Sequence, residues 1–391
     1  MTKTRRATLL ASLSLLFGGL LAPGALAFDE VRIGGRYLMQ VGVFDFDNIS
    51  GETDSNTRAI RNDVELWFDV EGRAGRALTY GASAEIQFDE DDGGDNLDFD
   101  EAYVFLQGPW GRFEGGNQDG PVDKMALFAP FVGQALDLEG DWYEFLDDQV
   151  EPFAQVLESL DATKLYYVTP RIGGFQIGVS WAPEGDTEGT QTIVDERDLI
   201  ALPGVSDVAP QGLEPDENVD SLVGREDLRN WVEVGVRYDV RMGALMIKTF
   251  GAYSRADSTL IGTEDLEAFM GGAHLEFGTF TLGGAYMDHD NSMLRQGSEF
   301  EQKEWNIGVT WAQGPLGLGV NYAQTDRVFQ NGPTDQDTVL GMINYKLARG
   351  LDVGASLAYF DQEFLDDDIV TGLGTDNNDG YIVMLQTKVQ F

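Results

Sequence analysis

The sequence predicts an all-β protein, a sixteen-stranded antiparallel barrel that spans a membrane. Three observations carry this prediction. Segments of alternating polarity recur along nearly the whole chain, the connections between them are alternately short and long, and the first residues have the pattern of an export signal. Alternation with a period of two is typical of strands that have one apolar face and one polar face.

The beginning of the chain resembles a secretory signal. Three of the first six residues are basic, residues 7–21 are apolar, and residues 25–27 read Ala-Leu-Ala, which is a small-residue cleavage pattern. We therefore expect residues 1–27 to be a signal peptide. The mature chain would begin at Phe28, and residues 28–391 would form one domain without an internal boundary.

The composition is strongly acidic and contains no cysteine. Removing the three basic residues of the signal from the 26 in the chain leaves 23 against 67 acidic residues, a net charge of 23 − 67 = −44. Such a charge argues against nucleic acid as a partner. Without cysteine and with two histidines, thiolate chemistry and a histidine-based metal cluster are not expected, and no cofactor is predicted.

Sixteen segments have the periodicity of strands, and most contain about ten residues, the length of a tilted strand that crosses a bilayer. An even number of strands is usual for single-chain bacterial barrels. The predicted strands are 31–45, 58–71, 76–89, 98–108, 111–118, 162–170, 174–183, 229–241, 245–256, 265–277, 280–289, 301–311, 315–326, 336–346, 352–362 and 379–391.

The alternation is clear in the twelfth segment, where Trp305, Ile307 and Val309 share one face and Glu304 and Asn306 share the other. In the fourth segment no face can be assigned. Aromatic residues near the segment ends are expected to lie at the membrane interfaces, with Trp67 as an alternative lumen residue because it has polar parity. The candidate interface residues are Phe44, Trp67, Trp181, Trp231, Trp305, Trp311 and Tyr359.

The strands of a membrane barrel and of a soluble sandwich both alternate between apolar and polar residues. The lengths of the connections therefore decide between the two folds. Short turns such as 71–76 and 277–280 alternate with long acidic loops such as 290–300 and 363–378. A transmembrane barrel has short turns at one end and long loops at the other, whereas a sandwich has no reason for this rhythm. In hydrocarbon every backbone polar group needs a partner, so the last strand is expected to pair with the first.

Two long connections differ from each other in composition. Residues 184–228 are acidic and rich in Pro and Gly, and we interpret them as an outer loop. Residues 119–161 contain the apolar run from Met125 to Val132, which an exposed loop would not carry. This run favours a loop that packs against the inner wall of the barrel.

Several motifs together resemble the Gram-negative general porin family, in its alphaproteobacterial form. Residues 108–116 (GPWGRFEGG) are similar to the turn between the fourth and fifth strands of that family, although Asn117 stands where many members have Arg or Asp. Residues 167–170 (YVTP) resemble the end of its sixth strand. The loop 119–161 has the position of the family's third loop, and Phe391 resembles its C-terminal assembly signal.

The resemblance implies a multi-pass protein of the Gram-negative outer membrane, surrounded by lipid, that lets small hydrophilic solutes and ions diffuse through a water-filled channel. It also implies a homotrimer and insertion by the outer-membrane assembly machinery, which would read Phe391. The third loop would fold into the lumen and place acidic groups opposite basic groups of the wall.

Candidate pore residues follow from these expectations. The basic wall is predicted to comprise Arg32, Arg36 and Arg61, and the alternative is that these residues lie near the periplasmic rim and pair with neighbouring acids. The acidic side of the pore is predicted to come from the third loop, and the alternative is that these acids are solvated loop carboxylates. They are Asp123, Asp137, Glu139, Asp141 and Glu144.

The acidic runs 89–92 and 366–368 could hold Ca²⁺, but neither has the spacing of an EF-hand. The excess of acid predicts weak cation selectivity. The alternative is a substrate-specific channel, for example for a sugar, in which Trp142, Tyr143 and Phe145 would form an aromatic path. An enzyme is not expected because no carboxylate pair or histidine has a catalytic motif around it, and an adhesin would not explain the third loop.

Overall fold

The computed structural model describes residues 28–46, 57–89, 98–138, 140, 142–146, 158–185, 227–260, 262–294, 296, 301–329, 332–364 and 377–391. The expected signal peptide lies outside the described residues. So do most of the loop 184–228, nearly all of the acidic run 89–92, and the whole of the run 366–368.

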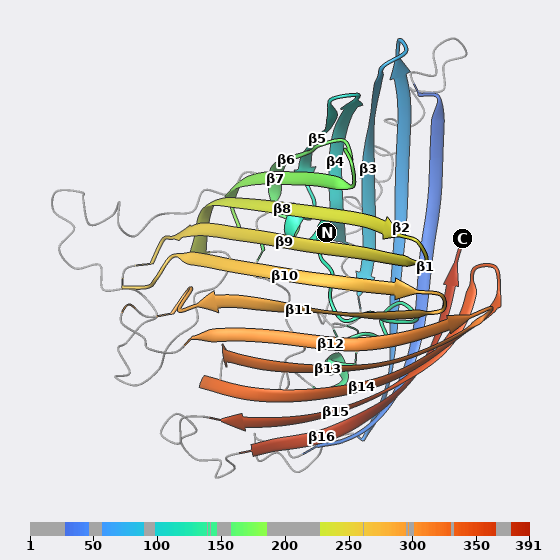
Figure 1. Cartoon of the computed structure of the whole chain (residues 1–391), viewed down its shortest axis with the longest axis vertical. Coiled ribbons are helices and arrows are strands. Elements are labelled where there is room, and N and C mark those ends of the chain that lie inside the picture. The colour runs from blue at the N-terminus through green and yellow to red at the C-terminus, as the bar shows by residue number, and fades with distance from the viewer. Residues whose placement is uncertain are drawn as a thin grey trace, which may run out of the picture.

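The described residues form sixteen antiparallel strands that follow one another around a closed barrel in chain order (Figure 1). The strands are β1 (Glu30–Phe46), β2 (Arg58–Ala74), β3 (Leu78–Asp89), β4 (Asp98–Gly108), β5 (Gly111–Asn117), β6 (Thr163–Val168), β7 (Phe175–Glu184), β8 (Leu228–Met242), β9 (Leu245–Ser258), β10 (Leu266–Phe277), β11 (Phe280–Asp290), β12 (Gln302–Gln313), β13 (Leu316–Phe329), β14 (Gly332–Ala348), β15 (Leu351–Phe364) and β16 (Asn377–Gln390).

All sixteen predicted segments are strands, and their bounds differ from the predicted ones by no more than four residues. The short turns of the predicted rhythm are confirmed, because two or three residues join several hairpins. The prediction of a long loop at 327–335 is wrong, because β13 ends at Phe329 and β14 begins at Gly332. Gly278 and Gly314 open two of these turns with φ angles of 63° and 60°. Tight hairpin turns require such positive φ values, which glycine adopts without steric cost.

The barrel closes between its first and last strands. β1 pairs with β16 over eleven residue pairs, from Arg36 opposite Gln390 to Phe46 opposite Gly380. Beyond this ladder, the backbone of Phe391 forms two hydrogen bonds with Gly35, of 3.1 and 3.2 Å. Closure of this kind removes the unpaired edges that a membrane would not tolerate.

The two faces of the wall differ as the alternation predicted. On β12, Trp305, Ile307 and Val309 are exposed on the outer face, whereas Glu304 and Asn306 are buried on the inner face. Large apolar side chains are also exposed on the outer faces of most of the other strands. An apolar exterior around a polar interior is the arrangement that a bilayer stabilises.

For two of the aromatic residues expected at the membrane interfaces the prediction is wrong, because they face the interior. Phe44 and Trp231 are buried inside the barrel, where Phe44 packs against Phe145 and the Trp231 indole donates a hydrogen bond of 2.7 Å to Ser254. Both residues share the parity of polar neighbours, and parity decides the face more strongly than distance from a strand end. Trp67 lies inside as well, over Gly34.

The fourth segment contains a bulge, and the apolar run for which no face could be assigned follows it. Ala84 of β3 pairs with Ala102, but Ile86 pairs with Phe99, so β4 contains one extra residue at this point. A bulge of this kind changes the parity of the strand that contains it. Above the bulge, Phe105 faces inward and its outward neighbour Val104 is exposed.

The apolar core lies between the inner wall and the segment that joins β5 to β6. Buried side chains of this segment, from Val122 to Phe145, form one cluster with inward side chains of the strands. Within the described part of the chain, no helix has the length and apolar character needed to cross a membrane.

Candidate functional site

The segment between β5 and β6 begins with a short helix, α2 (Pro121–Met125), that packs against the inner wall. Pro121 stands in the first turn, where a missing backbone N–H costs nothing. Val122 and Met125 are buried, and the Pro121 ring lies against Gly178 of β7. The apolar run thus begins at the last residue of this helix.

The loop then follows the wall in strand order, and at each step it rests on an inward-facing glycine. A Cβ atom added at any of these glycines would lie within about 3.1 Å of a loop atom, which is closer than ordinary contact. Glycine in a strand interior often marks such a close approach. The contacts join Gly178 and Gly235 to Pro121, Gly272 to Leu127, Gly308 to Ala129, Gly317 to Val132, Gly354 to Leu136 and Gly42 to Phe145.

Polar groups of the wall bind the backbone of the loop at several points. Asn306 on β12 accepts a hydrogen bond of 2.7 Å from the Ala129 N–H, and His274 on β10 bonds the Phe128 carbonyl at 2.6 Å. The Gln386 side chain on β16 donates to the Gln134 carbonyl at 2.7 Å. These bonds satisfy backbone groups that would otherwise be buried without partners.

The second half of the loop reaches β15 and β1. Trp142 is fully buried, stacks against Phe360 of β15, and donates its indole N–H to the Leu138 carbonyl at 3.0 Å. A 3₁₀ turn, η1 (Tyr143–Leu146), places Phe145 against Gly42 of β1. The loop thus lines the interior from β7 through β16 to β1.

Glu233 of β8 holds the loop where it leaves and rejoins the wall. Its carboxylate accepts hydrogen bonds from the Ser159 N–H and Oγ, both at 2.8 Å, and from Ser180 Oγ at 2.9 Å. A Cβ atom on Gly120 would collide with the same carboxylate at 1.5 Å. Glu233 therefore contacts both ends of the loop.

The three residues of the predicted basic wall lie at two different depths. Arg36 and Arg61 face the interior, and Arg61 is only 7% exposed. Arg36 pairs with Asp63, at 2.7 Å, and with Glu65, both on the neighbouring strand β2. Arg32 is exposed and lies 3.6–3.8 Å from Glu30 and Glu71.

The predicted third-loop acids are not gathered at one place. Asp123 lies on α2 near the root of the loop, whereas Asp137 is half-buried beside the part of the loop that packs on β14 and β15. Glu139 and Asp141 lie outside the described residues, and for Glu144 only the backbone, in η1, is described. A pore role for these acids and for the basic wall stays a prediction.

Inward-facing basic residues of the described wall commonly pair with a carboxylate on the same strand or the next. Arg237 lies 3.1 Å from Asp239 and also donates to the Met125 carbonyl of the loop at 3.3 Å. Lys388 lies 3.3 Å from Asp352. Similar pairs join Lys248 to Glu276 and Arg112 to Glu114. Such pairing reduces the net field of the wall.

An acidic cluster, which the sequence did not indicate, lies at the root of the loop. The carboxylate oxygens of Glu101, Asp119 and Asp161 lie within 4.8 Å of one another. Glu101 lies on β4, Asp119 lies two residues after β5 and Asp161 lies two residues before β6, so only the folded chain brings them together. Glu101 faces inward beside the bulge that sequence alternation could not reveal.

Burial and mutual repulsion raise the pKa values of carboxyl groups around this cluster. Burial, with the neighbouring Asp119, raises the pKa of Asp123 to about 7. Burial and the same neighbour raise the pKa of Asp161 to about 8. Burial, followed by the charges of Glu233 and Asp119, raises the pKa of Glu158 well above its usual range. Removing charged groups from water and placing like charges together both disfavour the ionised form.

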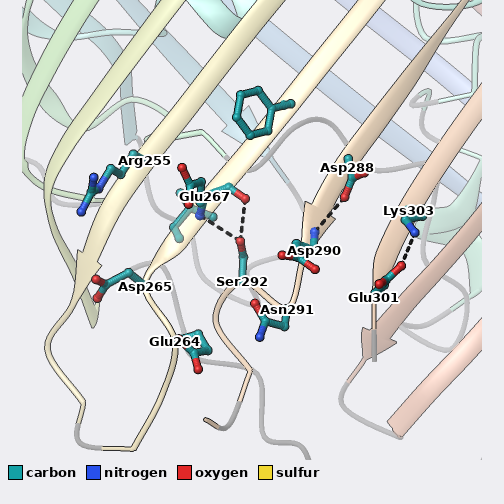
Figure 2. Close-up of a pocket in the computed structure, with 12 residues that line it drawn as sticks. Arg255, Glu264, Asp265, Glu267, Asp288, Asp290, Asn291, Ser292, Glu301 and Lys303 are labelled. Carbon is teal, nitrogen blue, oxygen red and sulfur yellow. Dashed lines mark hydrogen bonds and ion pairs between the residues drawn. The ribbon is translucent and has the colours of Figure 1, made fainter. Parts of the chain in front are cut away.

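A pocket of about 530 Å³ lies elsewhere, at the loop end of β9 to β12 on the outer face of the barrel (Figure 2). Within the pocket, Ser292 Oγ accepts a hydrogen bond from the Glu267 N–H and donates one to the Glu267 carbonyl, both at 2.8 Å. Asp288, Asp290 and Glu301 also line it. Its position on the outer rim separates it from the interior that the loop surrounds.

Comparison with known proteins identifies one family. A family described as Gram-negative porin matches residues 10–365 of the chain. Uncharacterised proteins of Rickettsia conorii and Rickettsia felis are each 22% identical to this chain, over 315 and 313 residues. These matches cover 68% and 67% of this chain and 70% of each relative.

Solved structures with the same fold include bacterial outer-membrane proteins. A mutant of the Rh. blastica porin is 16% identical, with a TM-score of 0.56 over 93% of this chain and all of that one. A loop L8 deletion mutant of OmpT, an outer membrane protein of Vibrio cholerae, is 14% identical, with a TM-score of 0.56 over 93% and 99% of the two chains.

The inward glycines give a first prediction. Gly272→Ala places a Cβ atom 2.1 Å from the Leu127 carbonyl oxygen, so the loop must shift, and overpacking of this kind costs about 1–3 kcal/mol. Gly341→Ala is the control because a Cβ atom there meets nothing within 4 Å. Relative to the wild-type protein in detergent, we expect a lower unfolding midpoint for Gly272→Ala and an equal or higher midpoint for Gly341→Ala. Equal midpoints for the two variants would contradict the close approach.

The polar anchors give a second prediction. Asn306→Ala removes the acceptor of two backbone donors, Ala129 N–H at 2.7 Å and Ala285 N–H at 3.0 Å. Each buried donor left without a partner costs about 1–3 kcal/mol. We expect faster cleavage of the loop by an added protease. Thr310→Ala, on the same face of β12, is the control, and a cleavage rate equal to that of this control would argue against the anchor.

Proposed function

Because the chain belongs to the Gram-negative porin family, we propose that this outer-membrane channel lets small hydrophilic solutes and ions diffuse passively through its barrel, with a weak preference for cations. The family and the fold favour a channel over an enzyme. The observation that carries the proposal is the contrast between the faces of the wall, apolar outside and polar with paired charges inside.

The charges of the interior support both parts of the selectivity, its sign and its weakness. Basic residues of the described wall are largely matched by carboxylates, as for Arg36, Arg237 and Lys388. The root of the loop adds carboxylates beyond those pairs. A small excess of negative charge along a water-filled channel attracts cations, but salt screens it over about 8–10 Å.

The proposed partners follow from the family and from the outer surface. Exposed apolar side chains on the strands fit the lipid of the outer membrane. Phe391 is exposed next to β1, which leaves its side chain available to the assembly machinery. Membership of the family also supports export through the signal peptide and a homotrimer, and both belong to the proposal.

A substrate-specific sugar channel is the second candidate, and it would need aromatic faces open to the lumen. Trp142 is fully buried against Phe360, and Phe145 is buried against Gly42 and Phe44. Of the three aromatic residues considered for a sugar path, Tyr143 alone is half-buried. The packing of the other two favours the general channel.

Planar-bilayer recording tests the proposal. We expect ohmic conductance steps from the purified protein, and a reversal potential in a KCl gradient that has the sign of a cation preference. Because charges of opposite sign act in opposite directions, Asp137→Asn should move the reversal potential toward zero, and Arg61→Gln should move it away from zero.

The outcomes separate the candidates. An anion preference of the wild-type protein would contradict the proposed selectivity, and the absence of conductance would contradict the channel. Block of the current by one sugar at low concentration, but not by others of similar size, would favour the substrate-specific channel. If both variants shift the reversal potential in the same direction, the charges of Asp137 and Arg61 do not act on the permeating ions as proposed.

A further inference from the structure

The acidic cluster closes the root of the third loop. The loop leaves the wall after Asn117 and returns at Thr163, and these two residues pair, with Thr163 Oγ1 donating to Asn117 Oδ1 at 2.6 Å. Asp119 and Asp161 each lie two residues inside the loop from this pair. Glu101 reaches them from β4 and accepts a hydrogen bond of 3.3 Å from the Asp119 N–H.

The spacing of the carboxylates matches the shell of a single ion. Oxygen ligands lie about 2.3–2.6 Å from Ca²⁺, so two ligands on opposite sides of the ion are about 5 Å apart. One oxygen from each of Glu101, Asp119 and Asp161 lies within 4.8 Å of the other two. An ion at the centre of these oxygens would lie no more than about 2.8 Å from each of the three, close to the distance that Ca²⁺ needs.

The charge around the cluster is not balanced by the neighbouring lysines. Lys124 lies 3.6 Å from Glu101, but it also lies 3.8 Å from Glu114 and is shared between them. Lys164 donates to the Leu160 carbonyl. Against these two lysines stand seven carboxylates of the described residues that act on one another here, namely Asp100, Glu101, Asp119, Asp123, Glu158, Asp161 and Glu233.

A second observation also favours a bound cation. Glu158 is only 1% exposed, its Oε2 has no hydrogen-bond partner, and the charges of Glu233, Asp119 and Asp123 act on it. The Oδ1 atom of Asp161, within the cluster itself, is also buried without a hydrogen-bond partner. Buried polar atoms of folded proteins are rarely left unsatisfied, and an exception calls for a partner such as an ion.

We propose that Glu101, Asp119 and Asp161 bind a divalent cation at the root of the third loop, with Glu158 as the neighbouring carboxylate. The ligands are all carboxylate oxygens, which suit hard cations, and the irregular arrangement on a loop suits Ca²⁺ better than the strict octahedron of Mg²⁺. Bound there, the ion joins β4 to both ends of the loop. The site does not depend on the proposed function, since it would hold an ion whether or not the barrel conducts.

Calorimetric titration of Ca²⁺ into the EDTA-treated, folded full chain in detergent tests the site. The triple variant Glu101→Gln, Asp119→Asn, Asp161→Asn is compared with Glu264→Gln, Asp290→Asn, Glu301→Gln, which removes the same charge from the outer pocket of Figure 2. We expect one saturable site per chain in the wild type and in the outer-pocket control. The first variant should lose it, and the unfolding midpoint should rise with Ca²⁺ only where the site remains.

The single variant Asp161→Asn keeps the test decisive if the triple variant fails to fold. It should weaken Ca²⁺ binding at least tenfold while leaving the heat-dependent gel mobility of the folded barrel unchanged. No saturable binding to the wild type, or equal binding by the wild type and Asp161→Asn, would overturn the proposal. Equal loss in the outer-pocket control would show that Ca²⁺ binds the acidic surface in general and would overturn it as well.

Discussion

The interior of this barrel depends on the close approach of one loop to glycines that face inward. Seven strand glycines, from Gly42 on β1 to Gly354 on β15, lie where a Cβ atom would meet the loop. A loop at this distance excludes water, so its backbone groups must find partners on the wall, and Asn306, His274 and Gln386 provide them. The path of the loop is thus fixed by the wall.

The same constraint shapes the charges. A loop held against the wall brings its two ends together at Glu233, and it also gathers Asp119 and Asp161 next to Glu101. Elsewhere in the described interior, basic residues such as Arg36 and Lys388 have carboxylate partners nearby. At the root of the loop, by contrast, the described carboxyl groups outnumber the neighbouring lysines.

The strands could be predicted from the sequence because a period of two is a local signal, and the buried position of the run from Met125 to Val132 could be predicted because an exposed loop would not be apolar. The inward position of Phe44 and Trp231 was predictable from the alternation of their strands, in which they share a face with polar residues, but not from their nearness to the strand ends. The acidic cluster was not predictable. Its members come from three separate segments, and the face of Glu101 depends on a bulge that only the pairing of β3 with β4 reveals.

The path of the loop inside the barrel can be measured directly, because the chain has no cysteine of its own. An added Cβ at Gly317 lies 2.9 Å from that of Val132, near the 3.5–4.5 Å that a disulfide needs. The pair Val132→Cys, Gly317→Cys should form a disulfide in the folded protein, seen as faster gel migration of the unreduced chain. The control pair Val132→Cys, Gly341→Cys, with Gly341 on the outer face, should not. Absence of the first disulfide, or equal formation of both, would contradict a loop that rests on the inward glycines.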